Sequence, residues 1–270
     1  MQEDQRSGQL TGRTILAVFA HPDDESLACG GTLARAADAG ANVVLLCASR
    51  GERGSISDPS LVPDGDLGRA RAHELRAAAS VLGISEITIL DHPDGDLRWA
   101  HVPILHEEIV MMIRRYRPDA VITFGEDGLY WHLDHVGIHE RTWTAVRSLG
   151  NEAPALYYVT MPQGLMRELV QSARGRGEST EGLWGIAPDA FGDSAKPPTL
   201  VVDVGPWVAR KLAALRCHRT QMGPTNPIGW IDEDEARRWL GHEYFRRATV
   251  ESNGPAILES LAEPTAGLKP

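Results

Sequence analysis

The chain has 270 residues, of which 42% are hydrophobic and 24% charged, and its formal net charge is −10. This composition is typical of a globular protein with one sizeable core. The negative charge argues against nucleic acid as a partner, because phosphates need neutralisation by Lys and Arg, and against an anionic membrane surface.

The sequence shows neither a membrane segment nor a disulfide framework. No apolar run reaches the roughly 20 residues that cross a bilayer, and the first ten residues lack the apolar centre of a signal peptide. Cys29, Cys47 and Cys217 form no CxxC pair, which suits a reducing compartment. We therefore expect a cytoplasmic protein without a nucleic-acid or membrane partner; the sequence leaves a homo-oligomer open.

Short apolar runs alternate with helical patterns through the first half of the chain. Near-continuous apolar runs are typical of parallel strands covered on both faces. They predict strands over residues 14–20, 41–49, 87–91 and 120–124. Helices are expected over 26–39, 68–82, 103–116 and about 134–147. This order predicts an α/β, Rossmann-like fold, with a doubly wound, mainly parallel sheet and helices on both faces.

The second half is less regular. It predicts strands at 155–161 and 199–204 and a helix at 206–217. Residues 175–198 are rich in Gly, Ser, Pro and Asp and indicate a long loop or lid, and 54–66 form a second such loop. We expect a single domain over 1–270, with a flexible tail at 1–12 and an irregular C-terminal part that forms lid loops.

The first chemical cluster follows the first predicted strand directly. It reads His21-Pro22-Asp23-Asp24-Glu25, at the carboxyl end of a strand, where doubly wound sheets bind ligands. Neighbouring buried carboxylates are costly unless a cation or a proton compensates them. Imidazole and carboxylate together are suitable ligands for Zn²⁺.

A second cluster, His132-Leu133-Asp134-His135, follows the strand predicted at 120–124. Both clusters should open at the same edge of the sheet and can converge on one metal. Three protein ligands plus water make the catalytic zinc arrangement. The spacing favours one His and one Asp from the first cluster and one His from the second.

The motifs AHPDDE and His-x-Asp-His, at these places, resemble the PIG-L/LmbE superfamily of N-acetylglucosaminyl deacetylases, in particular its mycothiol-type deacetylase and amidase branch. The resemblance covers about residues 14–139. It implies a zinc-dependent N-deacetylase that acts on a small-molecule amino sugar. It also implies that His21, Asp24 and His135 bind the metal, Zn²⁺ or else Fe²⁺ or Co²⁺, and that Asp23 is the general base.

The same resemblance implies roles for further residues. His132 would stabilise the oxyanion in its protonated form or act as general acid, with Asp134 orienting an imidazole. Tyr130 would lie near the reacting carbonyl, and Arg71 and Asp94 would hold substrate hydroxyls. The family has Pro between His and Asp of the second motif, where this chain has Leu; that change removes backbone rigidity but no chemical group.

Several of these residues also have plain structural explanations. Asp23 and Asp24 fit an N-cap for the helix near residue 26, and Glu25 fits a role at the helix dipole or in support of the ligands. His139 is expected to be a packed or supporting histidine, although it stands four residues after a predicted ligand. His218 is treated as structural.

Three other functions stay open. A related amidase would cleave a larger acyl group or a thiol- or glyco-conjugate, and the lid loops would decide this. An Asp pair after a first strand also serves Mg²⁺-dependent phosphoryl transfer, but Mg²⁺ prefers oxygen ligands, so His21 and His135 argue against it. A non-catalytic sugar-binding protein is disfavoured because neither Asp23 nor a ligand is lost.

Overall fold

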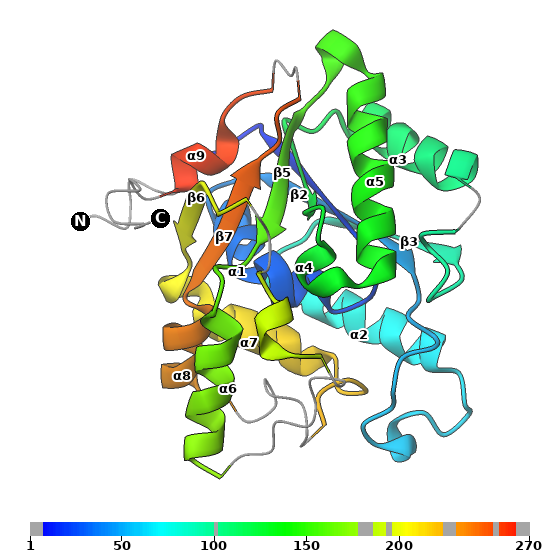
Figure 1. The fold of residues 1–270 in the computed structure, drawn as a ribbon. Helices are drawn as coiled ribbons and strands as arrows, with labels where there is room; N and C mark the ends of the chain where they lie inside the picture. Colours follow the sequence, from blue (N-terminus) through cyan, green and yellow to red (C-terminus); the bar gives the residue numbers. More distant parts are fainter. Residues whose placement is uncertain are drawn as a thin grey trace.

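The computed structural model describes residues 8–99, 102–177, 186–192, 196–223, 231–250 and 254–262. Within these ranges, seven strands form one sheet in the order β3-β2-β1-β4-β5-β7-β6 (Figure 1). The predicted α/β class with a mainly parallel sheet is confirmed.

Five neighbouring strands of the sheet are parallel. They are β1 (Thr14–Phe19), β2 (Asn42–Ser49), β3 (Glu86–His92), β4 (Ala120–Phe124) and β5 (Ala155–Thr160). β1 and β4 are apolar and almost wholly buried, as expected for strands with helices on both faces. From β1 the strand order runs through β2 to β3 on one side, and β4 and β5 are added on the other side. The strand order therefore reverses between β1 and β4, which is where such folds bind ligands.

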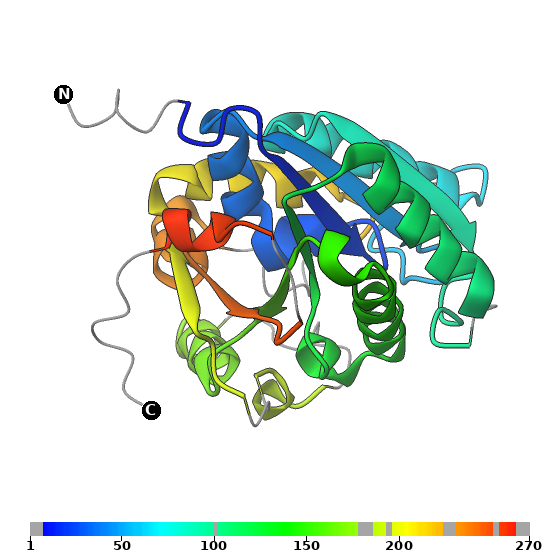
Figure 2. The same ribbon diagram turned by 90° about the horizontal axis from the view of Figure 1, so that it is seen from above.

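Helices cover both faces of the sheet (Figures 1 and 2). On one side α1 (Asp24–Asp38), α2 (Leu67–Leu82) and α7 (Val208–Cys217) pack on one another. On the other side α3 (Val102–Tyr116) packs against α5 (Leu133–Ser148). The short α4 (Gly128–Trp131) connects β4 to α5. Each long helix lies within two residues of its expected bounds.

The second half adds elements that the sequence did not reveal. β6 (Leu200–Asp203) was expected, but β7 (His242–Arg247), antiparallel to both β5 and β6, was not. Nor were α6 (Leu165–Gly175), α8 (Glu233–Leu240) and α9 (Ile257–Leu261). β7 has the sequence HEYFRR, whose charged residues do not resemble a buried strand. Glu243 can be buried because it forms an ion pair at 2.6 Å with Lys211, a residue distant in the sequence.

The described parts of two expected loops and of the expected tail contain local structure. Within the tail expected over 1–12, Leu10 is buried in the core and its N–H donates to the Ala39 carbonyl at 2.8 Å; residues 1–7 lie outside the described part. The loop 54–66 holds a 3₁₀ turn at Pro59–Leu61. The lid expected at 175–198 holds another at Pro188–Ala190, and its residues 178–185 and 193–195 are also outside the described part.

The described helices were also compared with the length of a bilayer. None of them is long and apolar enough to cross a membrane.

Candidate metal centre

The two motif clusters meet at the carboxyl edge of the sheet. β1 ends at Phe19 and continues into residues 21–25, while β4 ends at Phe124 and leads through α4 to His132 at the start of α5. Asp94 comes from the loop after β3. The sheet therefore brings together chemical groups from three separate crossovers, at the edge that the sequence predicts.

The turn after β1 holds an unusual backbone conformation. Asp23 has φ 117°, a region that non-glycine residues rarely occupy, at a cost of about 1–3 kcal/mol. Its N–H donates to Oε2 of Glu25 at 3.1 Å, and the N–H of His21 donates to Oδ2 of Asp24 at 2.7 Å. Backbone strain held in place by charged side chains is a common property of functional sites.

Three buried side chains turn their ligand atoms toward one another. Nδ1 of His21 lies 3.3 Å from Nε2 of His135. The Asp24 carboxylate lies 3.5 Å from the first of these nitrogens and 3.3 Å from the second, through its two different oxygens. All three residues are at least nine-tenths buried. The set predicted from the motifs thus converges on one point.

The other nitrogen of each imidazole is already occupied. Nε2 of His21 lies 3.1 Å from a carboxylate oxygen of Asp134 and of Asp94, and Nδ1 of His135 lies 3.0 Å from the Gly128 carbonyl. Because carboxylates and carbonyls only accept, these nitrogens carry the protons. In the neutral imidazoles, each of the two nitrogens that face each other therefore carries a lone pair and no proton.

Two lone pairs and a carboxylate at this spacing repel one another unless a cation or a proton lies between them. Two imidazole nitrogens and one carboxylate are a donor set that suits Zn²⁺, Fe²⁺ or Co²⁺. The second nitrogen of each metal-bound histidine is commonly held by a carboxylate or a carbonyl, as here. The residues present therefore fit a divalent transition metal.

The electrostatics of the cluster agree with this fit. Burial lowers the pKa of His21, but hydrogen bonds to Asp134, Asp24 and Asp94 outweigh it and hold the pKa well above its usual value. Burial would raise the pKa of Asp24, and the imidazoles of His135 and His21 bring it well below its usual value instead. The site stabilises an ionised Asp24 and an added positive charge beside it.

Two further groupings around His21 bring possible ligand atoms close together. Among the described residues, ligand atoms of His21, His132 and His135 lie within 4.8 Å of one another, and so do those of His21, Asp94 and Asp134. The second grouping uses the side of His21 that its two carboxylate hydrogen bonds occupy. The hydrogen bonds around it therefore favour a cation on the His135 side.

Asp23 stands beside these donors without joining them. Its side chain is 28% exposed, and one carboxylate oxygen lies 3.1 Å from the Arg71 guanidinium. Burial raises the pKa of Asp23 and the Asp24 charge adds to it, against the opposing effect of Arg71. A carboxylate with a raised pKa next to a cation site is the arrangement that a general base needs.

Arg71 lines the cavity and makes three hydrogen bonds within the protein. It is buried, and it donates to the carbonyls of Gly51 and Pro22 as well as to Asp23. Gly51 has φ +63°, and a Cβ there would lie 2.2 Å from the guanidinium, so only glycine fits. These contacts hold Arg71 against Asp23, and its place in the cavity lining keeps the expected contact with substrate hydroxyls as a prediction.

Asp94 and Asp134 support the cluster from the side of β3. Oδ1 of Asp94 contacts His21, and Oδ2 accepts the N–H of Arg53 at 2.8 Å; despite partial burial, these contacts lower the pKa of Asp94 to about 2. Asp134 accepts the N–H groups of Gly95 and Leu97 at 2.7 and 3.0 Å. The orienting role expected for Asp134 has a clear physical basis here, because it fixes the ring of His21.

His132 is both an N-cap and a member of the site. It caps α5, with Nδ1 accepting the N–H of Asp134 at 3.3 Å, so in the neutral ring Nε2 carries the proton. Burial lowers the pKa of His132 to about 4, and the neighbouring histidines add to this. The Tyr130 ring lies 5.8 Å from His132 and 5.2 Å from His135. The expected cluster of His132 and Tyr130 beside the ligands is therefore present.

Glu25 and His218, for which the sequence indicated a supporting and a structural role, hold the strained turn together. His218, at the end of α7, is fully buried, with Nε2 lying 3.0 Å from Oε1 of Glu25. The other oxygen of Glu25 holds the N–H of Asp23. His218 and Glu25 are 193 residues apart, so no local spacing could reveal the pair. His139, by contrast, packs against Tyr158 with Nδ1 on the Phe124 carbonyl, as a supporting histidine would.

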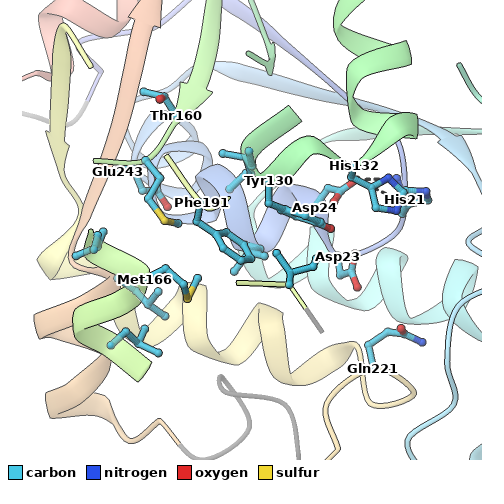
Figure 3. A pocket seen from close by; sticks show the side chains of 18 of the residues that line it. His21, Asp23, Asp24, Tyr130, His132, Thr160, Met166, Phe191, Gln221 and Glu243 are labelled. Atoms are coloured by element: carbon cyan, nitrogen blue, oxygen red, sulfur yellow. Dashed lines mark hydrogen bonds and ion pairs between the residues drawn. The ribbon is translucent and has the colours of Figure 1, made fainter. Parts of the chain in front are cut away.

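A cavity of about 490 Å³ opens on this cluster (Figure 3). Figure 3 shows the side chains of Asp23, Asp24 and His132 near one end of the cavity and those of Phe191 and Met166 farther along. The volume of the cavity lies within the range of about 300–1,000 Å³ that is typical of small-molecule sites. Trp131, directly before the second motif, is 55% exposed and is not among the residues that line this cavity.

Together, the fold and the buried imidazole–carboxylate cluster define a Rossmann-like α/β protein with a small-molecule site at the sheet's carboxyl edge. Residues 16–146 match the family model described as PIG-L, GlcNAc-PI de-N-acetylase. The chain is 30% identical over 269 residues to a 1D-myo-inositol 2-acetamido-2-deoxy-alpha-D-glucopyranoside deacetylase of Thermobispora bispora, covering 87% of this chain and 88% of that one. The chain belongs to the PIG-L family.

Solved structures share the fold at lower identity. The N,N'-diacetylchitobiose deacetylase of Pyrococcus horikoshii is 21% identical with a TM-score of 0.57, over 87% of this chain and 84% of that chain. A 4-carboxy-2-hydroxymuconate hydratase of Pseudomonas putida is 20% identical with a TM-score of 0.58, over 87% and 96%. Since a hydratase shares this fold, the reaction must be argued from the site.

Proposed function

We propose that the protein is a metal-dependent hydrolase that removes an acyl group from the nitrogen of an amino sugar or amino-sugar conjugate. The observation that carries the proposal is the convergence of His21, Asp24 and His135 beside the separate carboxylate of Asp23. Family membership supports the same activity, since the family model and the Thermobispora relative are both named as N-deacetylases.

We assign the metal to His21 Nδ1, His135 Nε2 and the Asp24 carboxylate, with Zn²⁺ as the first choice and Fe²⁺ or Co²⁺ as alternatives. A bound divalent cation supplies Lewis acidity and lowers the pKa of water toward about 7. Asp134 and Asp94 hold the far nitrogen of His21, which fixes the ring plane and raises its basicity as a ligand.

Asp23 acts as the general base in this proposal. Its carboxylate reaches the cavity beside the donors and takes a proton from the water that attacks the amide carbon. Arg71 and the Glu25 hydrogen bond keep it in place. The same carboxyl group then returns the proton to the amine nitrogen as the C–N bond breaks, which yields a carboxylate and a free amine.

His132 and Tyr130 face the other side of the reacting carbonyl. The N-cap hydrogen bond leaves a proton on Nε2 of a neutral His132, so the ring can donate a hydrogen bond to the oxygen that gains negative charge. The low pKa of His132 makes this neutral form preferable to the protonated form expected from the resemblance. Tyr130 completes the wall beside it.

The alternative enzymes are less well supported. Mg²⁺-dependent phosphoryl transfer would need mainly oxygen ligands, whereas two of the three converging donors are imidazole nitrogens. A non-catalytic binding protein would not need Asp23 in a strained turn beside a cation site. An amidase for larger conjugates has the same chemistry and differs only in the cavity.

The test is amine and acetate release from a panel of N-acetylated amino sugars, including an N-acetylglucosaminyl inositol. Metal-stripped protein is assayed alone and with Zn²⁺, Fe²⁺ or Co²⁺, beside an Asp23→Ala variant. The proposal expects metal-dependent release that the variant lacks. If the protein binds none of the three metals, the proposal is overturned. If the metal-loaded protein hydrolyses no member of the panel, the result favours the conjugate amidase.

A further inference from the structure

The cavity at the metal centre has two chemically different halves. On one side it is lined by polar groups that come from the loops after β2 and β3 and from the turn after α7: Arg53, Ser55, Asp94 and Gln221. These side chains and the nearby backbone offer hydrogen-bond donors and acceptors. Such a surface suits the hydroxyl groups of a sugar.

The other half is mainly apolar, and the polar or charged residues Thr160, Lys211, His242, Glu243 and Tyr244 also contribute to the lining of the cavity. Its walls come from α6, α8 and the segments beside them, elements that the sequence did not reveal. The lining side chains include Met161, Leu165, Met166, Leu169, Phe191 and Trp239. Leu169, Phe191 and Trp239 also belong to a second hydrophobic cluster, separate from the core under the sheet. We name this half the apolar chamber.

Tyr130 joins the apolar chamber to the metal centre. Its ring lies 4.9 Å from Phe191 on one side and 5.2 Å from His135 on the other. Figure 3 shows Tyr130 between the His21–His132 end and the Phe191–Met166 end. The chamber therefore begins where the reacting carbonyl is proposed to lie, and the polar half begins at Asp23 and Asp94.

An amide has two sides, the amine and the acyl group, and this cavity offers a polar and an apolar half on either side of the reacting centre. We propose that the sugar amine occupies the polar half and that the apolar chamber receives the acyl group. The substrate class is then an N-acyl amino sugar whose acyl chain is longer than acetyl. This inference rests on the proposed hydrolase activity and specifies its substrate.

Size supports a longer chain. An acetyl group adds only one methyl beyond the carbonyl, whereas a medium-length acyl chain adds several methylene groups that can contact the apolar side chains of the lining. Lys211 and Glu243, which also line the cavity, satisfy each other, because Glu243 is bound by Lys211 at 2.6 Å and by the N–H groups of Gly31 and Thr32 at 2.9 and 2.7 Å. The buried Nε1 of Trp239 has no hydrogen-bond partner in the described structure.

The reaction remains a simple hydrolysis. Water adds its oxygen to the acyl carbon, the C–N bond breaks, and a proton goes to the amine nitrogen. The products are a fatty carboxylate and the free amino sugar. Each methylene that leaves water for an apolar pocket contributes about 0.8 kcal/mol, roughly a fourfold gain in kcat/KM when it is realised in the transition state.

The experiment compares kcat/KM for N-acetyl-, N-butyryl-, N-hexanoyl- and N-octanoylglucosamine with zinc-loaded protein. We expect kcat/KM to rise with chain length and to be about tenfold or more higher for hexanoyl than for acetyl. A fall in kcat/KM from acetyl to the longer chains would overturn the chamber assignment while leaving the hydrolase proposal intact. No hydrolysis of any member by metal-loaded protein would remove the hydrolase proposal itself.

Variants on α6 localise the effect. Met166→Glu places a charge in the chamber and Met166→Gln places a neutral polar group of similar volume there, so both should lower the hexanoyl-to-acetyl ratio of kcat/KM. Gln171→Glu is the matched control, because it adds the same charge to an exposed position of the same helix and should leave the ratio unchanged. If the ratio is the same in folded, metal-loaded Met166→Gln and in wild type, the acyl group does not lie in the chamber.

Discussion

Nε2 of His218 lies 3.0 Å from Oε1 of Glu25, and the opposite oxygen of Glu25 holds the backbone N–H of Asp23 at 3.1 Å. The end of α7 is thereby linked to the proposed base through one carboxylate. Since Asp23 has φ 117°, its conformation needs such support. The C-terminal half of the chain thus helps to build the site that the N-terminal motif begins.

The first prediction concerns Glu25→Gln. A carboxylate accepts on both oxygens, while an amide turns an NH₂ group toward either the Asp23 N–H or the His218 and Ser26 side. We expect kcat to fall by about 10–100-fold from misplacement of the base, with KM and bound metal little changed. Glu107→Gln, on the exposed side of α3, is the control. An unchanged kcat in Glu25→Gln would refute this support role.

The second prediction separates the base from the ligands. Asp23→Asn should lower kcat by about 10²–10⁴-fold, the usual worth of a positioned base, and should keep one metal per chain because Asp23 is outside the donor triangle. Asp24→Asn should lose the metal as well. Activity and metal content are measured on the same samples. Loss of metal from Asp23→Asn would reassign that residue as a ligand.

The third prediction concerns Asp134. Its carboxylate holds Nε2 of His21 at 3.1 Å and two backbone N–H groups. Asp134→Asn weakens this hold, so metal affinity should fall by about 10–100-fold, as for other residues that orient metal ligands. A competition titration against a chelator measures the affinity. Wild-type affinity in this variant would mean that Asp94 alone orients the imidazole.

The fourth prediction concerns Leu133, where the family motif has Pro. Leu133 is the first residue of α5, and His132 before it has ψ 123°, the extended backbone that a residue before Pro prefers. The first helical position tolerates Pro well. Leu133→Pro should therefore raise the free energy of unfolding by about 0.4–1 kcal/mol, measured by denaturant unfolding. Thr144→Pro, inside the same helix, should lower it by about 3 kcal/mol or more, and a destabilised Leu133→Pro would contradict the account.

Much of the fold could be predicted because the strands of its first half are nearly pure apolar runs. β4, AVITF, is buried at every position, and only a covered parallel strand explains such a run. β7 could not be found in this way. Its Glu243 is satisfied by Lys211 and by the N–H groups of Gly31 and Thr32, partners that no local pattern reveals.

The site was predictable to the extent that its chemistry lies in short motifs. The buried strands indicated only that one His and one Asp of the first cluster and one His of the second meet at one edge of the sheet, and the family resemblance singled out His21, Asp24 and His135 among them. The expectation that Arg71 binds substrate stays a prediction, and the sequence did not reveal that its guanidinium also contacts Asp23 and two carbonyls. The apolar chamber could not be predicted from the sequence. Its walls come from α6 and α8, which the sequence did not reveal and which are distant in the chain from the two motifs.

One titration tests the central claim most directly. Metal-stripped protein receives Zn²⁺ in steps below and above one equivalent, and bound zinc and amine release from an N-acylglucosamine are followed in the same samples. The account predicts that activity is absent at the start, rises in proportion to bound zinc and levels off at one zinc per chain. Full activity in the stripped protein, or zinc bound at one equivalent without any hydrolysis of the acyl series, would contradict it.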